Sequence, residues 1–257
     1  MKLYVVICIP KSGSSSLVTM VERSLASGSH FRIPQLDIYK KSNLHPAEIF
    51  LQRRRILRGL IKYRVINEKM FWKKISKIAN DGDMISGHMP YGQPQLSGWD
   101  LNYITLLRNP IDRIISEYYY TRQGYLSRPR YRQIYHKGHS EVTGTKSFSE
   151  FLKYLYANKD RYNNPAVRFV TGTSNHKDPF AFLKKNYFHF GILERMDLFT
   201  NQLAEKLDTR PEKVWENKTL IKEPYQPTES DLELIHMLFN QDISFYNSTK
   251  EFILNTI

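Results

Sequence analysis

A group of hydroxyl side chains surrounds one lysine and one glycine near the start of the chain. The residues of this group are Lys11, Ser12, Gly13, Ser14, Ser15 and Ser16. The apolar run before them, residues 3–9, predicts a buried strand, and residues 17–25 have helical spacing of apolar side chains. A helix start offers unpaired backbone N–H groups and a positive dipole end. Glycine permits close approach of an anion to the backbone, and the hydroxyls add donors. The pattern therefore predicts a cradle for phosphate or sulfate, with a serine-rich turn without a ligand as the alternative.

The order of residues in this loop differs from that of a Walker A loop. A Walker A loop ends in a glycine followed by lysine and a hydroxyl residue, whereas Lys11 precedes Gly13 here. The downstream sequence shows no matching hydroxyl and carboxylate for magnesium. A P-loop kinase or nucleotidase is therefore disfavoured.

A second group of anion-binding side chains follows another short apolar stretch. Residues 102–107 predict a buried strand, and Arg108 comes directly after it. Asn109 can cap a helix whose first turn holds Pro110. Arg113 and Ser116 are three residues apart near the start of that helix, on one face. Together with Arg108 they could hold a second phosphate. The alternative is a surface helix whose arginine pairs with a neighbouring carboxylate.

The two motifs together resemble those of the PAPS-dependent sulfotransferases. The segments that carry the resemblance are P-K-S-G-S-S-S at 10–16 and R-N-P-I-D-R-I-I-S-E-Y at 108–118. Weaker matches are G-H-M-P-Y at 87–91, N-P-A-V-R at 164–168, G-I-L-E-R at 191–195 and N-Q-D-I-S-F-Y at 240–246. The resemblance is strongest to the carbohydrate-type branch (family 2), which includes the heparan sulfate sulfotransferases. Serine at 12 and 15 replaces a common threonine, and Asn109 replaces a common aspartate, with hydrogen-bonding capacity kept.

The resemblance implies roles for the residues of both motifs. Ser12, Gly13, Ser14, Ser15 and Ser16 would hold the 5′-phosphosulfate of the donor PAPS (3′-phosphoadenylyl sulfate), whose desulfated product is PAP. Lys11 would stabilise the charge that grows on the bridging oxygen, and Arg108 and Ser116 would bind the 3′-phosphate. Arg113 would help there or be structural.

A histidine is the expected catalytic base. His88 follows a predicted strand at 83–86, so it should lie at the same edge of the sheet as both anion sites. Histidine can accept a proton near neutral pH, and several members of the resembled family use a histidine in this segment. His136 and His139 are the alternatives. Asn164 and Arg168 are expected to organise the site wall or touch the acceptor, and Glu194 and Arg195 to form a buried pair or act in the site.

The formal net charge of +13 is high for a chain of 257 residues. Excess positive charge attracts anionic ligands. Two stretches lack acidic residues, 49–67 and 118–140, and the second interleaves tyrosines with arginines. We interpret them as an acceptor-side surface, with a solvated basic face as the alternative, and we expect the second stretch to form a loop over the site. A nucleic-acid-binding module would also explain the charge, but it would leave both phosphate motifs unexplained, so no nucleic acid is expected.

The cysteine content and the apolar runs limit which compartments and metal cofactors are compatible with the chain. Cys8 is the single cysteine, so no disulfide can form within the chain, and no cluster has metal-ligand spacing. No apolar run is long enough to span a bilayer, and because residue 3 already begins the predicted strand, we expect no signal peptide. We therefore expect a soluble, cytoplasmic, metal-independent enzyme of microbial type.

The order of the predicted elements indicates the fold class. Predicted strands at 2–9, 83–86, 103–107 and 188–193 are separated by predicted helices at 15–25, 47–61, 68–79, 110–122, 148–156 and 197–207, with a last helix at 229–254 broken near residue 242. This alternation predicts an α/β fold, a P-loop-type three-layer arrangement with a central parallel sheet flanked by helices, in one domain over 1–257. The predicted function is transfer of a sulfuryl group from PAPS to a hydroxyl of a carbohydrate or small metabolite. N-sulfation of a small metabolite is the alternative.

Overall fold

The central sheet of the protein is entirely parallel. The computed structural model describes residues 1–25, 28–32, 68–133, 138–210 and 225–255. Its five strands lie in the order β2-β3-β1-β4-β5. They are β1 (Lys2–Ile7), β2 (His30–Arg32), β3 (Met84–Gly87), β4 (Asp100–Leu107) and β5 (Tyr187–Ile192). The predicted α/β fold with a parallel sheet is confirmed. β2 was not predicted, because three residues are too few to show a strand pattern, and β4 begins three residues earlier than expected.

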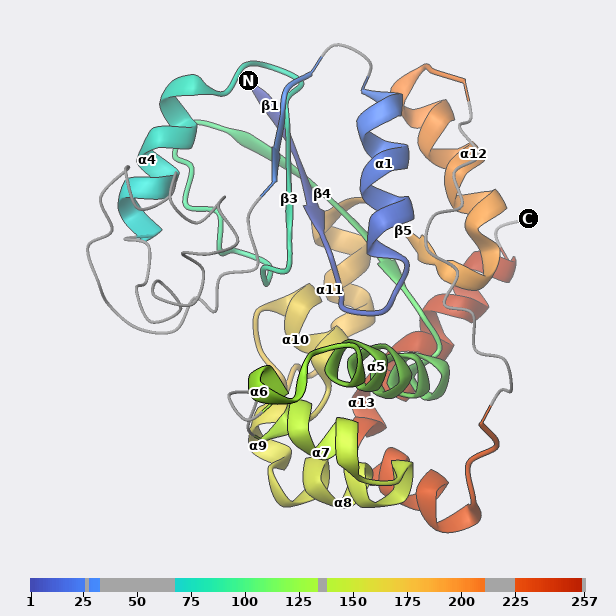
Figure 1. Ribbon diagram of the computed structural model, residues 1–257. Helices are drawn as coiled ribbons and strands as arrows, with labels where there is room; N and C mark the ends of the chain where they lie inside the picture. Colours follow the sequence, from blue (N-terminus) through green and yellow to red (C-terminus); the bar gives the residue numbers. More distant parts are fainter. Residues whose placement is uncertain (26–27, 33–67, 134–137, 211–224, 256–257) are drawn as a thin grey trace.

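Helices cover both faces of this sheet (Figure 1). Strand β1 and the residue after it alternate between the two faces: Leu3, Val5 and Ile7 belong to one apolar cluster, whereas Val6 and Cys8 belong to the other. The second cluster includes α1 (Ser14–Ser24) and α12 (Met196–Leu207), which lie side by side. The first includes α4 (Glu68–Ile78), α10 (Pro165–Thr171), α11 (Pro179–Asn186) and the end of α13 (Glu229–Asn255). This double burial explains why β1 is an unbroken apolar run.

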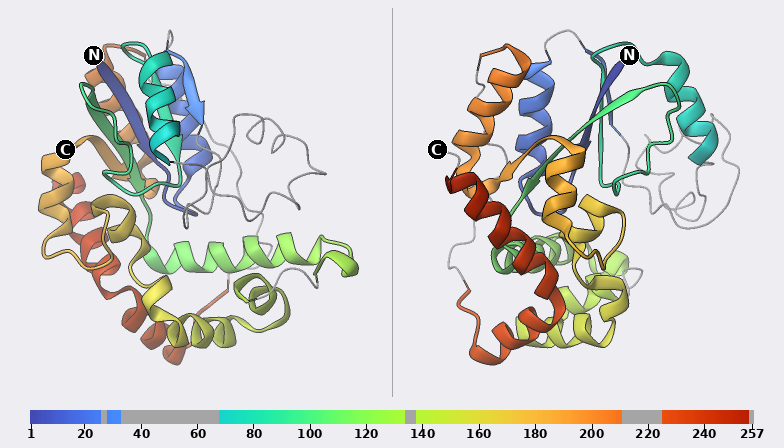
Figure 2. Two further views of the ribbon diagram at one scale, coloured as in Figure 1. Left: turned by 90° about the vertical axis from the view of Figure 1, so that its left-hand side faces the viewer. Right: turned by 180° about the vertical axis from the view of Figure 1, so that it is seen from behind.

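A further helical layer lies beyond the carboxyl ends of the strands. It has its own apolar cluster, with residues of α5 (Pro110–Leu126), α8 (Phe148–Ala157) and the first half of α13. Shorter helices complete it, namely α6 (Arg130–Gln133), α7 (His139–Thr145) and α9 (Lys159–Tyr162). Figure 2 shows α5 running beneath the strand ends. The loop expected over 118–140 is instead helical in its described part, since α5 continues to Leu126 and α6 and α7 follow. Residues 134–137 and the predicted helix at 47–61 lie outside the described residues.

At the bend of α13, the start of its second half and the start of α10 cap each other. The helix departs from helical geometry at Phe239 (φ −127°, ψ 28°), three residues before the predicted break. The Asp242 carboxylate accepts from the backbone N–H groups of Ala166 (3.0 Å) and Val167 (2.9 Å) at the start of α10. In return, Asn164 Oδ1 accepts from the backbone N–H groups of Gln241 and Asp242 at 3.2 and 3.3 Å. The N-P-A-V-R and N-Q-D segments therefore form a reciprocal cap between helices.

The Asp242→Ala substitution should destabilise the fold. It leaves two buried N–H groups without acceptors, which corresponds to a loss of about 2–4 kcal/mol in the free energy of unfolding. Denaturant titration of the wild type and the variant measures this loss. Glu251→Ala, at an exposed position of the same helix, is the control. A loss no larger than that of the control would contradict the capping role.

Candidate active site

The loop after β1 has the backbone geometry of an anion cradle. Gly13 adopts a left-handed conformation (φ +75°) directly before α1, and Lys11 is also left-handed (φ +65°). The left-handed conformation favours glycine here, and a Cβ atom at this position would also lie 2.7 Å from Leu193 Cδ1, which would have to shift. The Ser14 hydroxyl donates to the Ile9 carbonyl at 2.8 Å and tightens the turn. The predicted strand–loop–helix arrangement is thus present.

One hydroxyl of this loop is buried without a hydrogen-bond partner. Ser12 is 1% exposed, and its Oγ makes no hydrogen bond to another described residue. A buried polar atom left unsatisfied costs about 1–3 kcal/mol, and such atoms occur at sites that a ligand completes. Ser16 is also buried, in the first turn of α1. These features fit a group with several acceptor oxygens, such as phosphate or sulfate.

Arg108 links the second motif to the first. Strands β1 and β4 pair in register, with Ile7 opposite Thr105, so both motifs emerge at one sheet edge. The Arg108 guanidinium donates to the Lys11 carbonyl at 3.0 Å. Burial lowers the pKa of Arg108, although the neighbouring Asp112 and Glu194 carboxylates oppose this. The two predicted anion sites are therefore brought together.

The turn directly after β5 contacts the start of α5 through Glu194. Asn109 caps that helix as predicted, with its Oδ1 accepting from the Ile111 N–H at 2.9 Å. Its own N–H donates to Glu194 Oε1 at 3.0 Å. Burial and the Glu194 carboxylate, a hydrogen-bond partner, raise the pKa of Tyr246. Arg195 contacts Asp197 at 3.5 Å instead, so Glu194 and Arg195 each have a different partner.

One face of α5 carries both a candidate ligand residue and a buried ion pair. Ser116 is 3% exposed. Arg113 is buried and contacts Glu117 Oε2 at 2.8 Å, and its guanidinium lies over the Phe239 ring. Of the two roles expected for Arg113, the structure favours the structural one. Burial would raise the pKa of Glu117, but the adjacent His139 ring and the Arg113 guanidinium hold it at about 2.

The His88 ring is anchored by one of its nitrogens. It follows β3, and its Nδ1 lies 2.6 Å from the Cys8 carbonyl oxygen. Because a carbonyl only accepts, Nδ1 carries a proton, and the neutral ring has its lone pair on Nε2. Among the alternatives, His136 lies outside the described residues. His139 Nε2 lies 3.3 Å from Glu117 Oε1, and the His139 ring packs against Phe151 and Tyr162.

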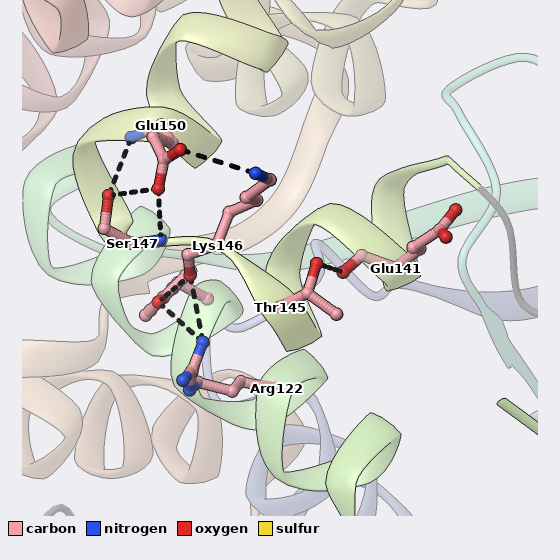
Figure 3. A network of polar contacts seen from close by, with 7 residues as sticks. Arg122, Glu141, Thr145, Lys146, Ser147 and Glu150 are labelled. Atoms are coloured by element: carbon pink, nitrogen blue, oxygen red, sulfur yellow. Dashed lines mark hydrogen bonds and ion pairs between the residues drawn. The ribbon is translucent and has the colours of Figure 1, made fainter. Parts of the chain in front are cut away.

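Two arginines expected on an acceptor surface, Arg122 and Arg128, instead contact the helical layer, and Figure 3 shows the contacts of Arg122. Arg122 donates to the Tyr118 hydroxyl and to the carbonyls of Thr143 and Lys146, which ties α7 to α5. Next to it, Ser147 and Glu150 form a capping box at the start of α8. Arg128 reaches Ser140 Oγ at 3.5 Å. The exposed Tyr131 keeps the predicted surface position, and stretch 49–67 lies outside the described residues.

Two further expected site residues have structural contacts. Asn164 is buried in the reciprocal cap described above. Arg168 donates to the Arg161 carbonyl at 2.8 Å. The sequence did not predict the contact between Lys11 and Tyr120 of α5. The only sequence signal for this contact is that Tyr120 lies one helical turn after Ser116.

The comparisons with known proteins agree with this geometry. A family model described as "Sulfotransferase domain" matches residues 3–209. The chain belongs to this family and is a sulfotransferase. The search of curated proteins gives no match. Across the described residues, no helix is long and apolar enough to cross a membrane.

The ion pair of Glu117 should make the fold sensitive to acid. Its folded-state pKa of about 2 lies below the ordinary value of 4.5. The ionised Glu117 carboxylate therefore stabilises the folded state above pH 4.5. As the pH falls towards 2 this stabilisation is lost, and the free energy of unfolding decreases by up to about 3 kcal/mol. Denaturant titrations between pH 6 and pH 3 should show a smaller acid-dependent loss in Glu117→Gln than in the wild type. Glu251→Gln controls for removal of one surface charge, and identical slopes in all three proteins would contradict the assignment.

Proposed function

We propose that this protein transfers a sulfuryl group from PAPS to a hydroxyl of a saccharide or small metabolite. The observation that carries the proposal is the Arg108–Lys11 hydrogen bond, because it joins two anion-binding motifs at the carboxyl edge of one parallel sheet. Ligands of such sheets bind where neighbouring strands connect in opposite directions. β1 and β4 form that point, since the chain proceeds from them to opposite sides of the sheet.

The donor has two anionic ends, and the site has two groups of donors to match. Residues 12–16 would hold the 5′-phosphosulfate through backbone N–H groups and hydroxyls, with Ser12 Oγ gaining the partner that it lacks among the described residues. Arg108 and Ser116 would hold the 3′-phosphate. PAPS, when bound, supplies the activated sulfuryl group.

Lys11 and His88 would act on the reacting atoms. The acceptor oxygen attacks sulfur in line with the bond from sulfur to the bridging oxygen, and that bond breaks. The Lys11 ammonium stabilises the electron pair left on the bridging oxygen, a charge that develops only in the transition state. His88 Nε2 takes the hydroxyl proton, while the bond from Nδ1 to the Cys8 carbonyl keeps the ring oriented. No metal is required, because cations and N–H groups supply the charge stabilisation.

The family branch, the domain organisation and the location of the protein are also proposals. We place it in the carbohydrate-type branch of the family, because the G-H-M-P-Y segment delivers His88 to the sheet edge. One domain would span 1–257, since α13 packs against both β5 and the helical layer. A cytoplasmic location remains part of the proposal.

Binding of PAP tests the donor assignment. We expect micromolar binding to the wild type by calorimetry at physiological salt, with no comparable binding of ATP–Mg. Arg108→Ala should weaken PAP binding on the order of 10- to 100-fold, because it removes a charged partner of the 3′-phosphate. Arg161→Ala, at an exposed arginine of α9, is the control. Absence of PAP binding at low salt would exclude the donor assignment.

Substitution of His88 tests the base. An asparagine side chain can still donate to the Cys8 carbonyl but cannot accept the proton, so His88→Asn should lower kcat by about 10²- to 10⁴-fold. PAP affinity should change little. Transfer of labelled sulfate from PAPS to a panel of desulfated polysaccharides and small alcohols measures kcat. Wild-type turnover in His88→Asn would assign the base to another residue.

A further inference from the structure

The ammonium group of Lys11 lies on an aromatic ring of the neighbouring helix. Its Nζ is 3.6 Å from the centroid of the Tyr120 ring on α5, within the range of a cation–π interaction. Tyr120 is one helical turn beyond Ser116. The contact therefore spans from the loop after β1 to the helix that carries the candidate 3′-phosphate residue.

Both ends of Lys11 are held in place. Its backbone is left-handed, and its carbonyl accepts from Arg108. Its ammonium lies on Tyr120, and among the described residues no carboxylate lies within ion-pair distance of it. A lysine side chain loses conformational entropy when it is fixed. Because Lys11 is fixed in the folded protein, that entropy is not lost again when a ligand binds.

We propose that Tyr120 is a positioning residue of the donor site, whose ring holds the Lys11 ammonium ready for the 5′-phosphosulfate. The inference rests on the proposed donor. A carboxylate in the same place would neutralise the lysine, whereas a ring face attracts the cation and leaves its charge intact. An ammonium has three N–H donors, so contact with a ring on one side leaves donors for an anion on another.

The surroundings of Lys11 explain why such a contact is useful. Burial and the neighbouring Arg108 cation lower the pKa of Lys11, and Glu117 only partly offsets them. The negative face of the Tyr120 ring favours the charged form at this point. Tyr120 is 59% exposed, so removal of its ring opens no core cavity and has little effect on the stability of the fold.

A double-mutant cycle on PAP binding tests the proposal. Calorimetry would compare the wild type with Tyr120→Phe, Tyr120→Leu, Lys11→Ala and the double variant Lys11→Ala/Tyr120→Leu. Tyr120→Leu should weaken PAP binding about fivefold, and Tyr120→Phe should stay within about twofold, because phenylalanine keeps the ring. In the Lys11→Ala background, Tyr120→Leu should have no further effect, since the ring would act only through the lysine.

Graded fluorination of the ring separates the electrostatic contact from shape. Phenylalanine analogues at position 120 with one, two and three fluorines keep the size of the ring while weakening its negative face. PAP affinity should fall stepwise along this series. Tyr156→Leu is the matched control, because Tyr156 is an exposed tyrosine of α8 with Lys159 5.6 Å from its ring centroid. That variant should bind PAP like the wild type.

Each contrary outcome has a distinct meaning. Tighter PAP binding by Tyr120→Leu would overturn the proposal, because the ring would then compete with the donor for the lysine. An equal loss in the wild-type and Lys11→Ala backgrounds, or a flat fluorine series, would also overturn it while leaving the donor assignment intact. Failure of the wild type itself to bind PAP would overturn the proposed function and this inference together.

Discussion

The parallel pairing of β1 with β4 is the constraint on which the candidate site depends. Parallel strands end at the same edge, so residues 97 positions apart in sequence, Lys11 and Arg108, come within hydrogen-bonding distance. The bond from the Arg108 guanidinium to the Lys11 carbonyl then fixes a left-handed loop residue that a side chain disfavours. Register, loop conformation and placement of the cations are thus consequences of one pairing.

This arrangement brings two half-buried cations together before a ligand is bound. Burial lowers the pKa of both Lys11 and Arg108, and the Arg108 charge acts on Lys11 in the same direction. Like charges in a poorly solvated place repel each other. In the proposed complex, an anion of the donor type would relieve this repulsion and would give the Ser12 hydroxyl a hydrogen-bond partner. The conformation of the loop and the proposed binding of an anion would therefore depend on the same two cations.

Local sequence patterns predicted the parts of the site that depend on local geometry. The strand–loop–helix order, the Asn109 cap and the sheet-edge position of His88 follow from neighbouring residues. Pairing of Arg113 with a neighbouring carboxylate was one of the two expectations, whereas its burial against Phe239 and the reciprocal cap of Asn164 and Asp242 could not be predicted. Both depend on packing of α13 against elements about 75 or more residues earlier in the chain, and an arginine or asparagine in a motif suits a ligand as well as it suits such contacts.

The helical layer contacts the proposed donor site through α5. Its helix α5 begins at the Asn109 cap, which Glu194 of the β5 end holds. Further along, α5 carries Ser116 and Tyr120, and then Arg122, which anchors α7. Tyr120 lies two residues before Arg122, so neighbouring positions of α5 contact the Lys11 ammonium and the backbone carbonyls of α7 and its C-cap. The placement of the Lys11 ammonium therefore depends on the packing of the helical layer as well as on the loop after β1.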